Sequence, residues 1–282
     1  MRNWSSQEIR CGFQNNHTSA DFGSLDFTSV RKSCRINSAE EGGVRLQLPK
    51  YRRVIIKISG EALAGSRNGG IDRDTLEKVC ASVKKCHELG VQIGIVVGGG
   101  NFWRGRSSER MERTRADHIG MMATVMNSLA MADALEQLGL EVRVQTALEM
   151  RAIAEPYIRN RAVRHFEKDR IVVFGCGTGN PFFSTDTAAS LRAAEVGAEV
   201  ILKATNTDGV YDCDPKINPN AKKYDVVSMS EVLAKELNFM DATAAAMCKE
   251  NKIPVVVFNI SDTENIYKAI IGEIVGTEVT CD

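Results

Sequence analysis

Hydrophobic and polar positions follow a repeating order from Tyr51 onward, in which short apolar runs alternate with longer amphipathic segments. Nearly continuous apolar runs, such as RRVIIKIS and VQIGIVV, are typical of strands that are buried on both faces. The intervening segments place apolar residues at helical spacing. The pattern predicts strands at 52–59, 91–97, 141–146, 170–176, 198–204 and 253–260, and helices at 71–90, 115–139, 185–197, 228–237, 241–251 and 262–272.

Capping residues support several of these helix boundaries. Asp72 or Asp74 can cap the helix that ends near Gly90, and Ser228 with Glu231 forms a Ser-x-x-Glu capping box. Because strands and helices alternate, the parallel strands need crossover helices on both faces of the sheet. We therefore predict an α/β fold: a three-layer αβα sandwich with a mostly parallel central sheet, formed by one domain over residues 51–282.

Residues 1–50 differ from the rest of the chain. They are rich in Ser, Asn and Arg and lack hydrophobic periodicity, which predicts a disordered extension. Transit peptides share this composition but contain few acidic residues. The acidic residues of this segment count against that interpretation: Glu8, Asp21, Asp26, Glu40 and Glu41. The alternatives are a plastid transit peptide, with location in the stroma, or a tail on a cytoplasmic protein.

Composition narrows the possible functions. The formal net charge is zero, so the chain lacks the overall basic character typical of nucleic-acid-binding proteins. The basic run RNRAVRH predicts a solvated helix face, with contact to a polyanion as the alternative. No apolar run approaches the roughly 18 residues of a membrane span. The eight cysteines include no CxxC pair and are interpreted as reduced thiols.

Ligands of open parallel sheets bind beyond the carboxyl ends of the strands, so the segments that follow the strands are the candidate site. Four such segments stand out: KISGEA, GGGNFWRG, GCGTGNPFFSTDT and KATNTDGVYDCDP. In the first, Lys57 lies within an apolar strand, where a lysine is unfavourable unless it meets an anion or reaches the sheet rim. Ser59 and Gly60 follow it and offer backbone N–H groups.

The two glycine-rich segments suit anionic ligands. In GGGN, Gly98 to Asn101, exposed N–H groups can form an anion nest, and the nearby Arg104 can chelate a phosphate. A plain glycine turn is the alternative. The GCGTGNPFFSTDT segment matches neither GxGxxG nor GxxxxGK[ST]. Its Asp186 is either a helix N-cap or a carboxylate aimed at the ligand.

The fourth segment, NTDGVYDCDP, is acidic and aromatic. Asp208, Asp212 and Asp214 with Tyr211 can approach a metal–nucleotide complex, or form a solvated turn. Together the four segments predict an enzyme that handles two anionic ligands. Phosphoryl transfer fits best, because it depends on positioning and charge stabilisation by Lys, Arg and backbone N–H groups.

In this order the motifs KISGEAL, GGGNFWRG, ADHIGMMATVMN, GTGNPFFSTDTAA and LKATNTDGVYDCDP resemble the bacterial-type uridylate (UMP) kinase family of the amino-acid-kinase superfamily. The resemblance covers Tyr51 to Thr280. It implies the amino-acid-kinase fold and transfer of the ATP γ-phosphoryl group to UMP with Mg²⁺, giving UDP and ADP in pyrimidine nucleotide biosynthesis. It also implies a homohexamer. Regulation by GTP and UTP is doubtful, because GSRNGG at 65–70 differs from the family forms.

The resemblance also implies roles for individual residues. The implied catalytic residues are Lys57, Arg104 and Asp186. The implied ATP-binding residues are Lys57, Ser59, Gly60, Gly100, Arg104, Thr205, Tyr211 and Asp214. The implied UMP-binding residues are Gly99, Asp117, Thr178, Gly179, Asn180, Pro181, Phe182, Phe183, Ser184 and Thr185. Metal ligands are not implied, and Phe182 and Phe183 are interpreted either as core residues or as a wall beside the base.

Two alternatives to this function are another superfamily phosphotransferase, acting on a carboxylate or carbamate, and a nucleotide- or RNA-binding regulatory protein. The first would need positive charge in the acceptor pocket, where this sequence has Asp117 and the neutral GTGNPFF loop. Retention of Lys57, Arg104 and Asp186 speaks against the second.

Overall fold

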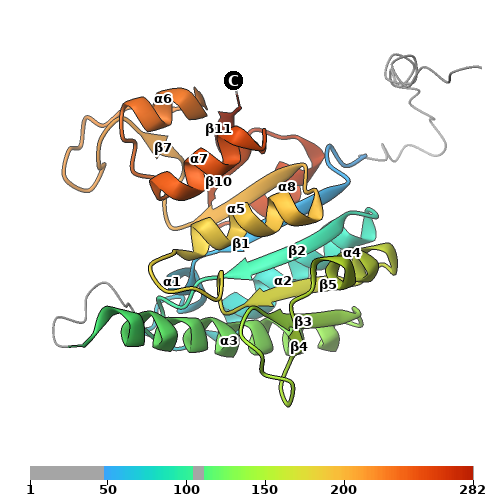
Figure 1. Cartoon of the computed structure of the whole chain (residues 1–282). Coiled ribbons are helices and arrows are strands. Elements are labelled where there is room, and N and C mark those ends of the chain that lie inside the picture. Colours follow the sequence, from blue (N-terminus) through green and yellow to red (C-terminus); the bar gives the residue numbers. More distant parts are fainter. Residues whose placement is uncertain (1–47, 104–110, 282) are drawn as a thin grey trace, which may run out of the picture. The chain divides into compact units, whose positions relative to one another are not determined.

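A sheet of nine strands organises the part of the chain that our computed structural model describes, residues 48–103 and 111–281 (Figure 1). The chain divides into two units, Met1–Leu46 and Gln47–Asp282, and the described residues belong to the second. The strand order is β4-β3-β5-β2-β1-β6-β10-β11-β9. The strands are β1 (Arg53–Ile58), β2 (Gln92–Val97), β3 (Val142–Thr146), β4 (Glu155–Pro156), β5 (Ile171–Gly175), β6 (Val200–Thr205), β9 (Val226–Ser228), β10 (Val255–Asn259) and β11 (Gly276–Thr280).

Within this sheet only the β10–β11 pair is antiparallel. Strands β7 (Val210–Tyr211) and β8 (Lys223–Tyr224) form a separate antiparallel ribbon. Because β5, β2, β1 and β6 are parallel neighbours, the segments that follow them meet at one edge of the sheet. That edge carries all four candidate segments of the sequence analysis.

Helices cover both faces of the sheet. One layer contains α2 (Arg73–Glu88), α3 (Arg113–Gln137) and α8 (Asn265–Ile271), whose buried residues pack with those of the sheet into one core cluster. The other layer contains α4 (Arg159–Glu167), α5 (Thr185–Val196), α6 (Met229–Ala234) and α7 (Ala242–Glu250), which share a second cluster. The short α1 (Gly60–Leu63) follows β1 directly. None of the described helices combines the length and apolarity that crossing a bilayer requires.

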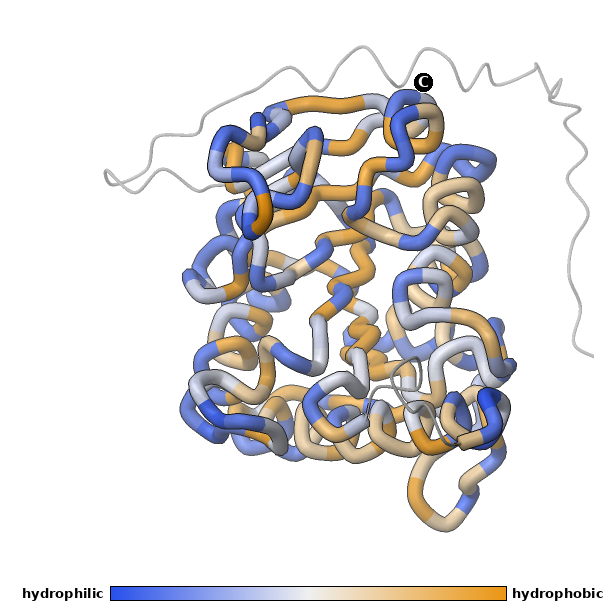
Figure 2. The backbone as a smooth tube through the Cα atoms, turned by 90° about the vertical axis from the view of Figure 1, so that its left-hand side faces the viewer, coloured by the Kyte–Doolittle hydropathy of each residue, from blue (hydrophilic) through white to orange (hydrophobic). Residues whose placement is uncertain are grey.

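The hydrophobic core follows the strands, which appear as the orange segments in the middle of the tube in Figure 2. In β1, RVIIKI, five of the six residues are buried and only the first, Arg53, is partly exposed; β5 is buried throughout. This is the pattern expected for strands that are covered by helices on both faces. The predicted three-layer α/β fold is therefore confirmed.

The six predicted strands and six predicted helices are all present, with boundaries shifted by a few residues. The sequence analysis did not predict β4, the β7–β8 ribbon, β9 or β11. Strands β4, β7, β8 and β9 have only two or three residues, too few for hydrophobic periodicity to show, whereas β11 has five and lies between β10 and the edge strand β9. The basic run at 159–165 lies in helix α4, where Arg159, Arg161 and Arg164 are exposed while Ala162 and His165 face the core.

The predicted caps are resolved in detail. Asp72, not Asp74, caps α2, because its carboxylate accepts a hydrogen bond from the Thr75 N–H at 2.8 Å. Ser228 caps α6 by accepting from the Glu231 N–H at 3.1 Å. The Glu231 carboxylate pairs with Lys235 at 2.6 Å, so the reciprocal bond of a capping box is replaced by an i,i+4 ion pair.

Candidate active site

Two buried lysines share one carboxylate at the centre of the site. Lys57 Nζ lies 2.9 Å and Lys203 Nζ lies 2.6 Å from Oδ1 of Asp186. The lysines are side by side because β1 and β6 pair in parallel with Lys57 opposite Lys203. Asp186 reaches them from the first turn of α5. Two ammonium groups facing one carboxylate leave a surplus of positive charge, which suits a phosphoryl group.

The pKa values in this cluster follow from burial and from the charges. Burial by itself raises the pKa of Asp186, but Lys57 and Lys203 overcome it and hold that pKa well below its usual range. Burial, with the positive charge of Lys57, lowers the pKa of Lys203 to about 8, although Asp186 acts in the opposite direction. Asp186 is therefore ionised at neutral pH, and Lys203 remains mostly protonated there but loses its proton more readily than an ordinary lysine.

Ser184, and not Asp186, caps α5. Its Oγ accepts hydrogen bonds from the N–H groups of Asp186 at 3.0 Å and Thr187 at 3.1 Å. Ser184 in turn donates to the carboxylate of Asp241, which also accepts from the Thr187 hydroxyl at 2.9 Å and caps α7. The interpretation of Asp186 as the N-cap is therefore wrong. Its carboxylate is left available for the two lysines because Ser184 takes the capping role.

Glycines let the segments after β1 and β2 lie in direct contact. A Cβ at Gly60 would lie 2.6 Å from both the backbone N of Gly100 and the backbone O of Gly98. A Cβ at Gly99 would lie 2.8 Å from the Gly120 carbonyl oxygen on α3. Ser59 caps α1 by accepting from the Ala62 N–H at 3.2 Å. The predicted ATP-side residues Ser59, Gly60 and Gly100 thus form one glycine-lined rim with Gly99.

A buried pair of asparagines, which the sequence analysis did not identify, fixes this rim. Asn101 and Asn127 exchange side-chain hydrogen bonds at 3.0 and 2.7 Å. Asn127 also donates to the Gly98 carbonyl at 2.7 Å, and Asn101 donates to the Gly70 carbonyl at 2.7 Å. The pair joins α3, the GGGN segment and the glycine-rich 65–70 segment. The sequence did contain a signal for this pair, because Asn127 is a polar residue within the apolar face of α3.

The loop between β5 and α5 is held against α3 by Asp117. Its Oδ2 accepts from the Phe182 N–H and from Arg113 Nε, both at 2.8 Å. The Arg113 guanidinium lies 5.5 Å from the centre of the Phe182 ring. Phe182 is 64% exposed and Phe183 is 51% exposed, so neither is a core residue. The alternative interpretation, a wall beside the base, stays a prediction; Phe183 lines the cavity described next, whereas Phe182 does not.

This loop and α3 enclose a cavity of about 140 Å³. Thr178 organises the loop by accepting from the Asn180 N–H and donating to the Asn180 carbonyl, both at 3.2 Å. The predicted acceptor residues that line the cavity are Gly99, Asp117, Thr178, Asn180, Phe183, Ser184 and Thr185. The structure therefore brings together residues from three separate segments of the chain. Gly179, Pro181 and Phe182 belong to the same loop but do not line the cavity.

The fourth candidate segment, KATNTDGVYDCDP, begins within β6. It places Thr205 at the end of that strand, beside Asn259 of β10. Its other predicted residues make local contacts. Tyr211 donates to Asp208 at 2.7 Å, and Asp214 accepts from the Lys216 N–H at 2.9 Å. Both of these hydrogen bonds stay within the loop after β6. Arg104 lies outside the described residues.

Lys203 is the principal residue that the sequence analysis missed. Its signal was available, because AEVILKA contains a lysine within an apolar strand, as VIIKIS does for Lys57. Within residues 48–103 and 111–281, no three His, Cys, Asp or Glu side chains converge in a manner suited to a metal ion.

A cationic cluster and glycine-rich rims at the carboxyl ends of a parallel sheet define a phosphotransferase of the α/β class. The sequence model of the amino acid kinase family matches residues 52–259, and the chain belongs to that family. Three solved structures show which members it resembles.

The structure of UMP kinase from Bacillus anthracis is 38% identical to this chain, with a TM-score of 0.79, over 82% of this chain and 97% of that one. UMP kinase from Ureaplasma parvum is also 38% identical, with a TM-score of 0.77, over 81% and 98%. Uridylate kinase from Archaeoglobus fulgidus is 28% identical, with a TM-score of 0.64, over 80% and 99%.

Proposed function

We propose that the protein is a UMP kinase, which transfers the γ-phosphoryl group of ATP to UMP and produces UDP and ADP in pyrimidine nucleotide biosynthesis. The observation that carries the proposal is the Lys57–Asp186–Lys203 cluster beside the cavity between α3 and the β5–α5 loop. The similarity to two bacterial UMP kinases at 38% identity supports the choice of acceptor.

In the proposed reaction a phosphate oxygen of UMP attacks the γ-phosphorus of ATP, and the bond from that phosphorus to the β,γ-bridging oxygen breaks. Lys57 and Lys203 neutralise the charge of the transferring group, which is the main requirement of such a transition state. Asp186 holds both ammonium groups at fixed positions and is itself too weakly basic to accept a proton. Catalysis thus rests on positioning and electrostatics.

We assign ATP to the rim that contains Lys57, Ser59, Gly60 and Gly100, together with Arg104 and with Thr205, Tyr211 and Asp214 of the loop after β6. We assign UMP to Gly99, Asp117 and the loop from Thr178 to Thr185, with Gly179, Asn180, Pro181, Phe182, Phe183 and Ser184 between. The magnesium ion enters as part of the Mg-ATP substrate, since Mg²⁺ in kinases is bound largely through substrate phosphates.

A substrate panel tests this function. Purified protein with Mg-ATP should release ADP in the presence of UMP, and much more slowly with CMP or AMP. Equal rates with all three nucleotides would overturn the uridylate assignment. Activity only with a carboxylate or carbamate acceptor would favour another phosphotransferase of the family.

Lys203 should cause the activity to fall at alkaline pH. We expect kcat/KM to be retained below about pH 8 and to fall as the pH rises through that value, because this lysine then loses the charge that stabilises the phosphoryl group. A Lys203→Arg variant keeps its charge and should lack this fall, even if its maximal rate is lower. The measurement is the pH profile of kcat/KM for UMP, and an identical alkaline limb in the variant would contradict the assignment.

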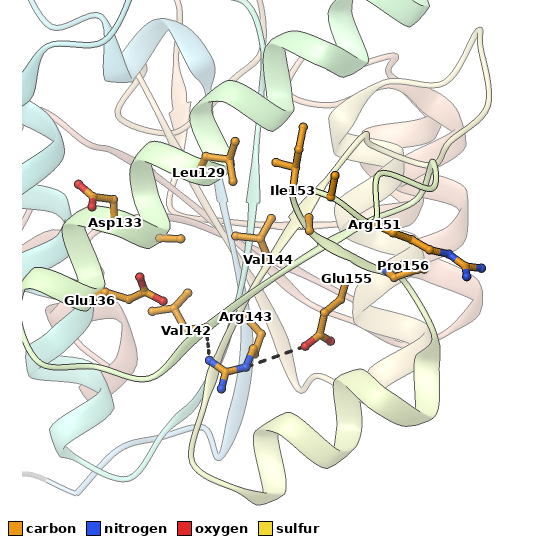
Figure 3. A pocket seen from close by; sticks show the side chains of 13 residues that line it. Leu129, Asp133, Glu136, Val142, Arg143, Val144, Arg151, Ile153, Glu155 and Pro156 are labelled. Atoms are coloured by element: carbon orange, nitrogen blue, oxygen red, sulfur yellow. Dashed lines mark hydrogen bonds and ion pairs between the residues drawn. The ribbon is translucent and has the colours of Figure 1, made fainter.

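We further propose that the protein assembles as a homohexamer. The outer side of α3 and the neighbouring 151–156 segment expose large apolar side chains: Ile119 (38%), Met126 (46%), Leu129 (36%) and Ile153 (55%). A cavity of about 580 Å³ lies there, between α3 and the sheet edge, as Figure 3 shows for Leu129 and Ile153. Such exposed apolar surface is typical of interaction sites.

Light scattering tests the hexamer. It should give about six times the chain mass of 30.9 kDa, and a monomer would refute this proposal.

We also propose that residues 1–50 form an extension separate from the kinase domain at 51–282, and that they direct the protein to the plastid stroma. The support is their Ser- and Arg-rich composition, and cytoplasmic location is the alternative. A fusion of residues 1–50 to a fluorescent protein should enter isolated plastids and be cleaved. A fusion that stays outside would rule out the targeting role.

A further inference from the structure

The indole of Trp103 presents a buried hydrogen-bond donor that no described residue satisfies. Its Nε1 atom is shielded from solvent and has no acceptor within the described part of the chain. A buried N–H without a partner is unfavourable, and in native structures such a group is commonly explained by a ligand or by water. The position of this donor therefore matters.

Trp103 lines the same cavity as Asp117, Thr178 and Asn180. Its backbone N–H donates to the Gly99 carbonyl at 2.9 Å, which fixes the residue to the glycine rim. The ring atom bonded to Nε1, Cδ1, lies near Gly120 on α3, since a Cβ added at Gly120 would lie 3.9 Å from it. Gly120 also lines the cavity.

Neighbouring polar groups in the cavity are already engaged. Thr124 donates its hydroxyl proton to the Met121 carbonyl at 2.6 Å and accepts from the Cys176 N–H at 2.9 Å. Asp117 accepts from Arg113 and from the Phe182 N–H. Thus these side chains already have protein partners, whereas the Trp103 donor has none among the described residues.

We propose that Trp103 is a binding residue for the acceptor nucleotide, and that its Nε1–H donates a hydrogen bond to an oxygen of UMP. This inference rests on the proposed function and adds a residue to the acceptor site. The bond is formed with bound UMP throughout the reaction, so it contributes to affinity for UMP and not to the chemical step.

The variant Trp103→Phe tests the proposal, since it keeps an aromatic ring and removes only the donor and part of the ring area. We expect the KM for UMP to rise about fivefold to tenfold, the size of one lost hydrogen bond, with kcat and the KM for ATP within about twofold of wild type. The matched control is Phe102→Leu, which alters the adjacent aromatic residue, 40% exposed and outside the cavity lining. Its KM for UMP should not change.

Tryptophan fluorescence supplies a binding measurement that does not depend on turnover. The chain has two tryptophans, Trp4 and Trp103, so Trp103→Phe reports the background from Trp4. Wild type should show a saturable change in tryptophan fluorescence with UMP alone, and the variant should show none.

Two kinetic outcomes would overturn the proposal while leaving the kinase function intact: an unchanged KM for UMP in Trp103→Phe, or an equal rise of that KM in Phe102→Leu. Failure of wild type to bind or phosphorylate UMP would overturn both.

Discussion

Replacing Lys57 by Met should lower kcat by about 10²–10³-fold while the protein remains folded. The ammonium group lost is one of two that neutralise the transferring phosphoryl group, whereas the methionine side chain still fills the strand position. Folding should survive because Asp186 keeps its contact with Lys203 at 2.6 Å and is not left unpaired. Steady-state rates with Mg-ATP and UMP, together with circular dichroism, provide the measurement.

The control for this variant is Lys78→Met, at an exposed position on α2 in the layer that contains α3 and α8. It makes the same chemical change away from the cluster and should retain full activity. A Lys57→Met enzyme with more than about a tenth of the wild-type kcat would show that this lysine does not stabilise the phosphoryl group.

Asp186→Asn should affect both activity and stability. Two buried ammonium groups would then face each other without a carboxylate, a situation that destabilises proteins by about 3–5 kcal/mol. We expect the free energy of unfolding to fall by a similar amount, and kcat to fall at least as far as in Lys57→Met because both lysines lose their fixed positions. Chemical denaturation and turnover with UMP measure the two effects.

The pH dependence of stability separates this electrostatic cause from a packing defect. The pKa of Asp186 in the folded protein lies below its ordinary value of 3.8, so its contribution is present above that pH and is lost as the pH falls toward the folded-state pKa. The stability difference between wild type and Asp186→Asn should therefore shrink below about pH 4. The exposed control Asp74→Asn, in the first turn of α2, should change stability little at any pH. A difference that is independent of pH would contradict the ion-pair explanation.

Local sequence determined most of the fold. Apolar runs such as those at 52–59 and 91–97 predicted buried strands because a strand covered on both faces has no polar side to show. The order of strands and helices then implied a parallel sheet, and the parallel sheet implied that the segments after its strands would converge. The same logic identified Lys57 and the glycine segments as candidate site residues.

Tertiary structure decided which side chain performs which task. From sequence, Asp186 was the candidate cap of α5, and only the structure shows Ser184 in that role, with its hydroxyl hydrogen-bonded to Asp241, the cap of α7. The partnership of Lys203 with Lys57 depends on the pairing of two strands that are far apart in the chain. Pairing register is a long-range property, and hydrophobic periodicity does not encode it.

Strand β11 and the exposed phenylalanines also depend on contacts that are remote in sequence. The antiparallel β11 and the exposed position of Phe182 depend on neighbours supplied by other segments, β10 in one case and Asp117 with Arg113 in the other. Sequence by itself determined the alternation of elements and the residues available at the sheet edge, because propensity and burial pattern act over a few neighbouring residues. The charge sharing at Asp186, the open donor of Trp103 and the asparagine pair under the glycine rim required the tertiary structure, because each depends on distances between residues remote in sequence.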